Sequence, residues 1–203
     1  MGMWTLFSGS FTKNLTDIFG IDKAAANEVR QKAKPKYREI ISELPKFEKA
    51  DRFKMNLVNC ALLCAFILNM PQRPDIERLT EYYKRSMMTS LMKKFCRKSG
   101  KKKFTEKDLD GMRKTAKLKA ADRNPFSWNM DLFEYPDGSG YEARFYKCGI
   151  CELTKKLGIY DLTPAMCRLD YTMSEAGETT DFVREYTLAE GGPYCDCGYK
   201  KKK

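Results

Sequence analysis

Most of the side chains able to carry out chemistry lie in the last third of the chain. Five of the eight cysteines fall between residues 148 and 197, together with acidic residues, an arginine and a glycine pair. The chain has no histidine, which excludes a Ser-His or Cys-His dyad and the usual histidine-rich zinc sites. Any acid or base must therefore be Asp, Glu, Tyr, Lys or a second thiol.

Cys167 and Asp170 form the first candidate pair. Thr163 followed by Pro164 predicts an N-cap and a helix start, which would place Cys167 near the first turn, where backbone N–H groups favour a thiolate. A spacing of three residues puts Asp170 on the same helix face. We predict these two residues as catalytic, although on spacing alone a buried thiol and an exposed carboxylate are the more ordinary interpretation.

Two further thiols could join this pair in one pocket. Cys148 lies at an expected junction between a strand and a helix, where a thiol can also face a helix N-terminus. Cys195 lies in an expected late strand. If these segments are neighbours, Cys148, Cys167 and Cys195 converge.

Arg184 is the candidate clamp for a substrate carboxylate, because a planar guanidinium binds a carboxylate through two parallel hydrogen bonds. The competing interpretation is a surface pair with Glu175 or Glu185.

A metal or iron–sulfur site is the alternative use of these thiols. Cys148-x-x-Cys151 and Cys195-x-Cys197 supply four thiolates in two close pairs, which could form a tetrahedral set. The second pair has an unusual spacing, and Cys167 is left over.

The elements expected to position these residues differ between the two parts of the chain. Residues 1–125 predict a helical bundle, with helices near 27–44, 51–70, 75–94 and 105–121 and a kink or break at Pro35. Asp75 and Thr105 are predicted N-caps, and Leu91 is expected to face inward. Cys60 and Cys64 lie in the most apolar segment and are expected to be small buried thiols.

Residues 126–203 predict strands at 128–135, 141–147, 182–190 and 194–199, with helices at 148–158 and 163–176 between the two strand pairs. The order β-β-α-α-β-β favours a four-stranded antiparallel sheet carrying two helices. The predicted fold class is α+β, with the helical bundle packed against this cysteine-rich region in one compact unit.

The spacing of these residues resembles a known family signature. The matching run is Cys148…Leu153…Gly158…Cys167-x-x-Asp170…Arg184-x-x-Thr187…Glu190-Gly191…Cys195-Asp196. It resembles the L-2-amino-thiazoline-4-carboxylic acid hydrolase family over residues 126–199. The resemblance implies hydrolytic opening of a small cyclic amidine-like ring to give N-carbamoyl-cysteine.

The resemblance also implies site residues. It places Cys148, Arg184, Thr187, Cys195 and Asp196 at substrate-binding positions beside the catalytic pair. The sequence departs from the family pattern at two positions, where Cys151 replaces a small residue and Cys197 an aromatic one. These departures weigh against an ancestral four-cysteine metal site.

Composition and charge limit the expected cellular location and binding partners of the protein. Residues 1–125 carry 28 Lys and Arg against 14 Asp and Glu, and residues 126–203 carry 10 against 13, so the net charge of +11 comes from the first part of the chain. We interpret this basic part as a solvated helical surface in preference to a nucleic-acid interface. No stretch reaches the roughly 18 apolar residues of a membrane span, and no secretory leader is evident. We therefore expect a cytoplasmic protein with free thiols.

The expected partner is a small-molecule substrate with a carboxylate. We expect no cofactor, no membrane and no nucleic acid, and leave a homo-oligomer open. A non-catalytic module that binds a small molecule, zinc or an iron–sulfur cluster is the alternative function.

Overall fold

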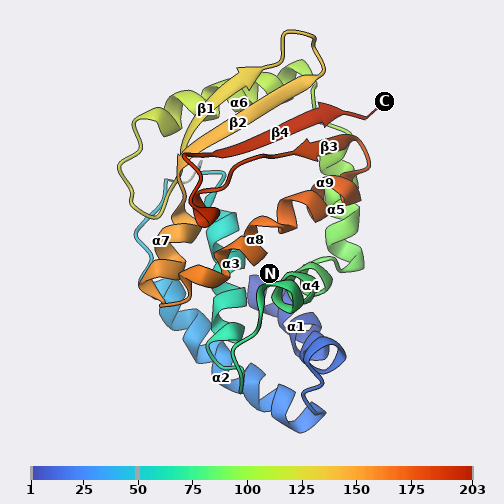
Figure 1. Ribbon diagram of the computed structural model, residues 1–203, viewed down its shortest axis with the longest axis vertical. Helices are drawn as coiled ribbons and strands as arrows, with labels where there is room; N and C mark the ends of the chain where they lie inside the picture. The colour runs from blue at the N-terminus through green and yellow to red at the C-terminus, as the bar shows by residue number, and fades with distance from the viewer. Residues whose placement is uncertain (1, 49–50, 203) are drawn as a thin grey trace.

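The computed structural model describes residues 2–48 and 51–202. Figure 1 shows the sheet at one end of the molecule and α1 and α2 toward the other, with α3 and α8 between them. The elements are, in chain order, α1 (Met3–Phe19), α2 (Lys23–Ser42), α3 (Lys54–Ile67), α4 (Ile76–Met87), α5 (Ser90–Gly100), α6 (Glu106–Ala120), β1 (Asn129–Glu134), β2 (Gly140–Lys147), α7 (Gly149–Lys156), η1 (Tyr160–Leu162), α8 (Thr163–Cys167), α9 (Leu169–Gly177), β3 (Thr180–Val183), η2 (Leu188–Glu190) and β4 (Cys195–Lys201).

The strands form one antiparallel sheet in the order β1-β2-β4-β3. This confirms the α+β class, with two strands before the helices of this region and two after them. The single helix predicted over 163–176 is divided into α8 and α9. Cys195 lies opposite Phe145, and Cys197 lies opposite Ala143. Because side chains alternate along a strand, Cys195 and Cys197 project from the same face of the sheet.

The predicted strand over 182–190 is wrong beyond its second residue. β3 ends at Val183, and residues 184–194 form a loop that contains η2. The backbone N–H groups of Glu185 and Tyr186 donate to the carboxylate of Asp196 at 2.8 and 2.6 Å. A strand cannot continue there, because these N–H groups are bonded to a side chain and not to a neighbouring strand.

α3 is the central helix of the core. Its side chains from Leu57 and from Cys60 to Phe66 are buried, which explains why this helix is apolar all round. Cys60 and Cys64 are fully buried neighbours with their sulfurs 3.7 Å apart, which confirms the prediction for this pair. No helix in the described ranges has both the length and the apolarity required to cross a membrane.

Both predicted N-caps are confirmed. The Asp75 carboxylate accepts a hydrogen bond from the Arg78 N–H at 2.8 Å. The Thr105 hydroxyl accepts from the Asp108 N–H at 3.3 Å, and the Asp108 carboxylate accepts from the Phe104 N–H at 3.0 Å. These contacts satisfy N–H groups that would otherwise lack a partner at the start of α4 and α6.

The helix predicted over 75–94 is two helices. α4 ends at Met87, and Thr89 caps a new helix, α5, by accepting a hydrogen bond from the Met92 N–H. The change of direction turns Leu91 outward, so the prediction that it faces inward is wrong: 58% of its surface is exposed.

α2 is continuous through Pro35, so the break into two helices predicted at this residue is not found. Pro35 lacks an N–H to bond the carbonyl of Gln31. Both residues are exposed, so water can hydrate that carbonyl.

Candidate active site

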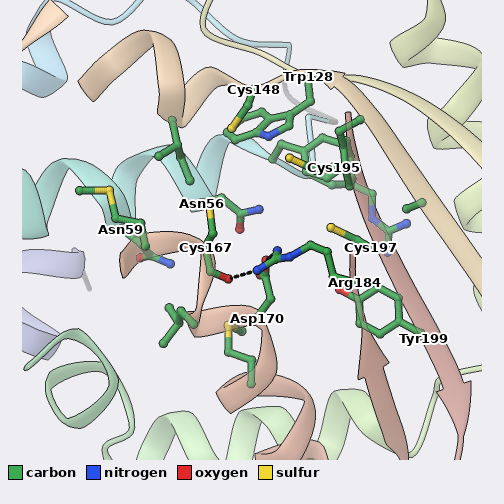
Figure 2. Close-up of a pocket in the computed structure, with 18 of the residues that line it drawn as sticks. Asn56, Asn59, Trp128, Cys148, Cys167, Asp170, Arg184, Cys195, Cys197 and Tyr199 are labelled. Carbon is green, nitrogen blue, oxygen red and sulfur yellow. Dashed lines mark hydrogen bonds and ion pairs between the residues drawn. The ribbon is translucent and has the colours of Figure 1, made fainter. Parts of the chain in front are cut away.

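A cavity of about 280 Å³ lies between one face of the sheet and the helices α3, α8 and α9 (Figure 2). It collects the chemically capable side chains from segments that are distant in sequence. Those lining it are Cys148, Cys167, Asp170, Arg184, Cys195 and Cys197. The predicted convergence of Cys148, Cys167 and Cys195 on one pocket is therefore present in the structure.

Cys148 is the N-cap residue of α7, immediately after β2. The pKa of its thiol is lowered, chiefly by a hydrogen bond from the Cys151 thiol. Burial opposes this effect, but the backbone N–H groups of Cys151 and Ile150 and the Trp128 side chain also stabilise the thiolate. Figure 2 shows Trp128 beside Cys148 at one side of the cavity.

Gly149 explains how the chain can bring Cys148 to this position. A Cβ atom at residue 149 would lie 2.1 Å from the carbonyl oxygen of Phe126 and 3.1 Å from the Trp128 ring. Only glycine permits this close approach, so α7 can start directly against the segment that carries Trp128.

Cys151 is buried and does not line the cavity. Its pKa is raised, chiefly by the hydrogen bond with Cys148 and then by burial. The two thiols therefore titrate as a pair, and the backbone N–H groups and Trp128 beside Cys148 favour loss of the first proton from Cys148.

The four-thiolate metal alternative is not supported by the geometry. Across residues 2–48 and 51–202, no three or more Cys, Asp or Glu side chains are placed to hold one metal ion. Each of the eight cysteines is a free thiol.

Cys167 does not have the environment that its sequence position predicted. Thr163 is the first residue of α8 and not its N-cap, and its hydroxyl bonds the Thr154 hydroxyl at 2.7 Å. α8 is only five residues long and ends at Cys167, so this thiol lies at the C-terminal end of a helix. Burial raises the pKa of Cys167, and the neighbouring Cys148 and Asp170 raise it further.

Asp170 and Arg184 form an ion pair, with Arg184 Nη1 2.9 Å from Asp170 Oδ2. Arg184 Nη2 also donates to the Cys167 carbonyl oxygen at 2.8 Å. The guanidinium carbon lies 5.2 Å from the Tyr171 ring centroid and 5.1 Å from that of Phe182. The surface pair with Glu175 or Glu185 is thus not formed.

Asp170 is surrounded by protein, yet 43% of its side-chain surface is accessible, because the carboxylate opens into the cavity. Burial raises the pKa of this carboxyl group, and Arg184 opposes the rise. A carboxylate with a raised pKa is a stronger base than an exposed one.

The match to known proteins covers most of the residues that line this cavity. The family model for L-2-amino-thiazoline-4-carboxylic acid hydrolase matches residues 55–199, from α3 to β4. The chain belongs to this family. None of the curated proteins and none of the solved structures that were compared matches the chain. The family takes its name from a hydrolase, and the match begins well before residue 126, where the sequence resemblance begins.

Two further residues of the family signature lie away from the cavity. Thr187 caps η2, accepting a hydrogen bond from the Glu190 N–H and donating to the Glu190 carboxylate at 2.8 Å. Both carboxylate oxygens of Asp196 hold the loop after β3. In this structure Thr187 and Asp196 therefore fix the loop that follows Arg184, and substrate contact is not supported by their positions.

Cys195 and Cys197 line the sheet side of the cavity as thiols. Cys195 Sγ accepts a hydrogen bond from the Leu188 N–H at 3.2 Å, yet burial raises its pKa to about 11. Burial also raises the pKa of Cys197 well above its ordinary value. Neither thiol is a better nucleophile than Cys148 near neutral pH.

Sequence reasoning missed several polar residues of the cavity wall that come from the helical part. They are Arg52, Asn56, Asn59, Tyr83 and Lys103. The buried Oδ1 atom of Asn59 has no hydrogen-bond partner within the described part of the chain. An asparagine inside the most apolar helix was the available signal, because such a residue needs a partner that the helix itself does not supply.

Proposed function

We propose that this protein hydrolyses a small cyclic amidine that carries a carboxylate, of the L-2-amino-thiazoline-4-carboxylate type. The observation that carries the proposal is that a thiol with a lowered pKa, Cys148, faces the same cavity as the ion-paired base Asp170. Membership of the hydrolase family supports the reaction class.

The ring carbon bonded to two nitrogens and the sulfur is the electrophile. In the first step the Cys148 thiolate forms a bond to this carbon, the ring C–S bond breaks, and the ring sulfur leaves and takes up a proton. In the second step Asp170 accepts a proton from a water molecule, whose oxygen attacks the same carbon, and the Cys148 thiolate leaves. One water has then been added, giving a carbamoyl group and a free thiol.

The nucleophile proposed here differs from the one favoured by the sequence. Cys167 lies in the same cavity, three residues from Asp170, and is the second candidate. Its raised pKa leaves a much smaller thiolate fraction near neutral pH than Cys148 has. Direct attack by water activated by Asp170, without a covalent step, is the remaining alternative.

The size of the cavity agrees with a small substrate. At about 280 Å³ it lies just below the roughly 300–1,000 Å³ typical of small-molecule pockets. One wall of the cavity is apolar and is formed by Phe53, Trp128 and Phe145. The ring centroid of Phe53 lies 5.4 Å from that of Trp128 and 5.5 Å from that of Phe145.

The test is turnover of L-2-amino-thiazoline-4-carboxylate by purified protein, followed by mass spectrometry for a product heavier by one water. We expect activity in the wild type and a loss of about 100-fold or more in Asp170→Asn. Asp181→Asn, which removes an exposed carboxylate from β3, is the matched control and should retain activity. No turnover by the wild type would overturn the proposal.

A further inference from the structure

Arg184 is a poor candidate for a free carboxylate clamp, because its charge is already compensated. Its guanidinium bonds Asp170 at 2.9 Å and the Cys167 carbonyl at 2.8 Å. A substrate carboxylate at Arg184 would approach the Asp170 carboxylate closely, and like charges at short range repel. A carboxylate needs another cationic partner in the cavity.

Two other cationic side chains line the same cavity. Lys103, in the connection between α5 and α6, donates from Nζ to the Tyr141 hydroxyl at 2.6 Å, and Nζ lies 3.8 Å from the centroid of the Tyr199 ring. Arg52 lies just before α3. Its Nη1 atom donates to the Thr115 hydroxyl at 3.4 Å and to the Met112 sulfur at 3.7 Å.

Neither cation is paired with a carboxylate within 4.0 Å in residues 2–48 and 51–202. The acidic group nearest to Lys103 is Asp108 on α6, which accepts a hydrogen bond from the intervening Tyr141 hydroxyl at 3.3 Å. Burial lowers the pKa of Lys103 to about 8, with Asp108 opposing this shift and repulsion from Arg52 adding to it.

Two cations that face one cavity without a paired anion repel each other in the empty site, and an anion that binds between them relieves this repulsion. This inference rests on the function proposed above. We propose that Arg52 and Lys103 form the subsite for the substrate carboxylate, whereas Arg184 remains the counter-ion of Asp170. The substrate then lies with its carboxylate toward Arg52 and Lys103 and its ring toward Cys148 and Asp170.

The experiment compares two probes that differ only in the carboxylate: L-2-amino-thiazoline-4-carboxylate and 2-aminothiazoline. Binding is measured by calorimetry in the Cys148→Ser background, so that turnover does not interfere. We expect the parent to bind the carboxylate probe about tenfold tighter or more, because charge-assisted hydrogen bonds are lost with the probe that lacks the carboxylate. We call the ratio of the two affinities the margin. Arg52→Gln and Lys103→Met should each reduce this margin and leave the affinity for 2-aminothiazoline unchanged.

Two variants test whether a reduced margin reflects the lost charge or a misfolded protein. Arg52 is exposed, so Arg52→Gln is expected to fold and keep its melting temperature even if Lys103→Met does not. Lys103→Arg retains the positive charge and should restore the margin. Because the Lys103 charge is lost as pH rises through about 8, the margin of the parent should also shrink between pH 7 and 9 and persist in Lys103→Arg.

The outcomes separate the subsite from the proposed function. If Arg52→Gln and Lys103→Met keep the margin of the parent, or if Arg184→Gln alone abolishes it, the subsite assignment is wrong while hydrolysis by the wild type still stands. If the parent binds neither probe and the wild type turns over neither, both proposals fail.

Discussion

Arg184 Nη1 lies 2.9 Å from Asp170 Oδ2, and both residues line the cavity. This ion pair links the residue that follows β3 to α9. Only 5% of the Arg184 side-chain surface is accessible, whereas 43% of that of Asp170 opens into the cavity. The arginine is therefore enclosed by protein and the carboxylate is presented to a ligand. This asymmetry fits a base held in place by its counter-ion.

Removing the counter-ion should make both activity and stability depend more strongly on pH. In Arg184→Met the Asp170 carboxylate loses its partner, so its pKa rises further and the acid limb of the activity profile moves to higher pH. The loss of stability should be smaller than the about 3–5 kcal/mol of a fully buried pair, because Asp170 reaches the cavity.

The sign of the pH effect on stability follows from the raised pKa. A folded-state pKa above the unfolded value means that stability falls as pH rises through the two values. The deficit of Arg184→Met should therefore shrink on acidification, as measured by urea unfolding at pH 4.5 and 7.5. A deficit of equal size at both pH values would contradict this. Asp170→Asn in the same background should recover stability at pH 7.5.

Cys148 should be the thiol that alkylates first. Its lowered pKa gives it a larger thiolate fraction at pH 7 than Cys167 or Cys195, whose pKa values are raised. Treatment with iodoacetamide for short times, followed by peptide mass spectrometry, should show the label on Cys148. Cys151→Ala removes the hydrogen bond that contributes most to this shift and should slow the labelling. Earlier labelling of Cys167 would count against the assignment.

Gly149→Ala should displace Cys148 without changing any chemically active group. The added Cβ would meet the Phe126 carbonyl oxygen at 2.1 Å, so the start of α7 must move. We expect a destabilisation of about 1–3 kcal/mol and a loss of turnover larger than stability alone explains. Gly9→Ala, in α1 with open space at the Cβ position, is the matched control.

Lys119 should be important for stability and not for binding. It is buried and forms ion pairs with Asp51 and, at 2.7 Å, with Asp122, and it bonds the Ser127 hydroxyl at 2.6 Å. Lys119→Met would leave two carboxylates without their cation and should cost about 3–5 kcal/mol in urea unfolding.

This cost should also shrink on acidification, but at a lower pH than the cost at Arg184. Burial opposes the change, but hydrogen bonds from Lys119, Ser127 and Asn124 lower the pKa of Asp122 to about 2. A lowered folded-state pKa contributes stability that is lost as pH falls from about 4 to 2, so wild type and Lys119→Met should converge there. An unchanged gap at low pH would argue against this role.

The sheet and the core could be predicted because local patterns determine them. The apolar run around Cys60 and the caps at Asp75 and Thr105 each follow from nearby residues. The break at Thr89 was missed because the apolar spacing continues across it, although a threonine before a new turn was the local signal for a cap.

The site was only partly predictable, for a physical reason. Cys148, Cys167, Asp170 and Arg184 were identified by residue type and spacing, and the fold brings them to one cavity. Their protonation depends on contacts across elements, such as Trp128 on Cys148 and Arg184 on Asp170, which spacing does not reveal. The cations from the helical part, Arg52 and Lys103, carry no motif at all.

The most direct measurement of the central claim is turnover of L-2-amino-thiazoline-4-carboxylate by Cys148→Ser and Cys167→Ser side by side. Both changes replace one sulfur in the same cavity, so each controls for the other. We predict that Cys148→Ser loses at least about 1,000-fold in kcat while Cys167→Ser stays within about tenfold of wild type. Full activity in Cys148→Ser, or the larger loss in Cys167→Ser, would contradict the account.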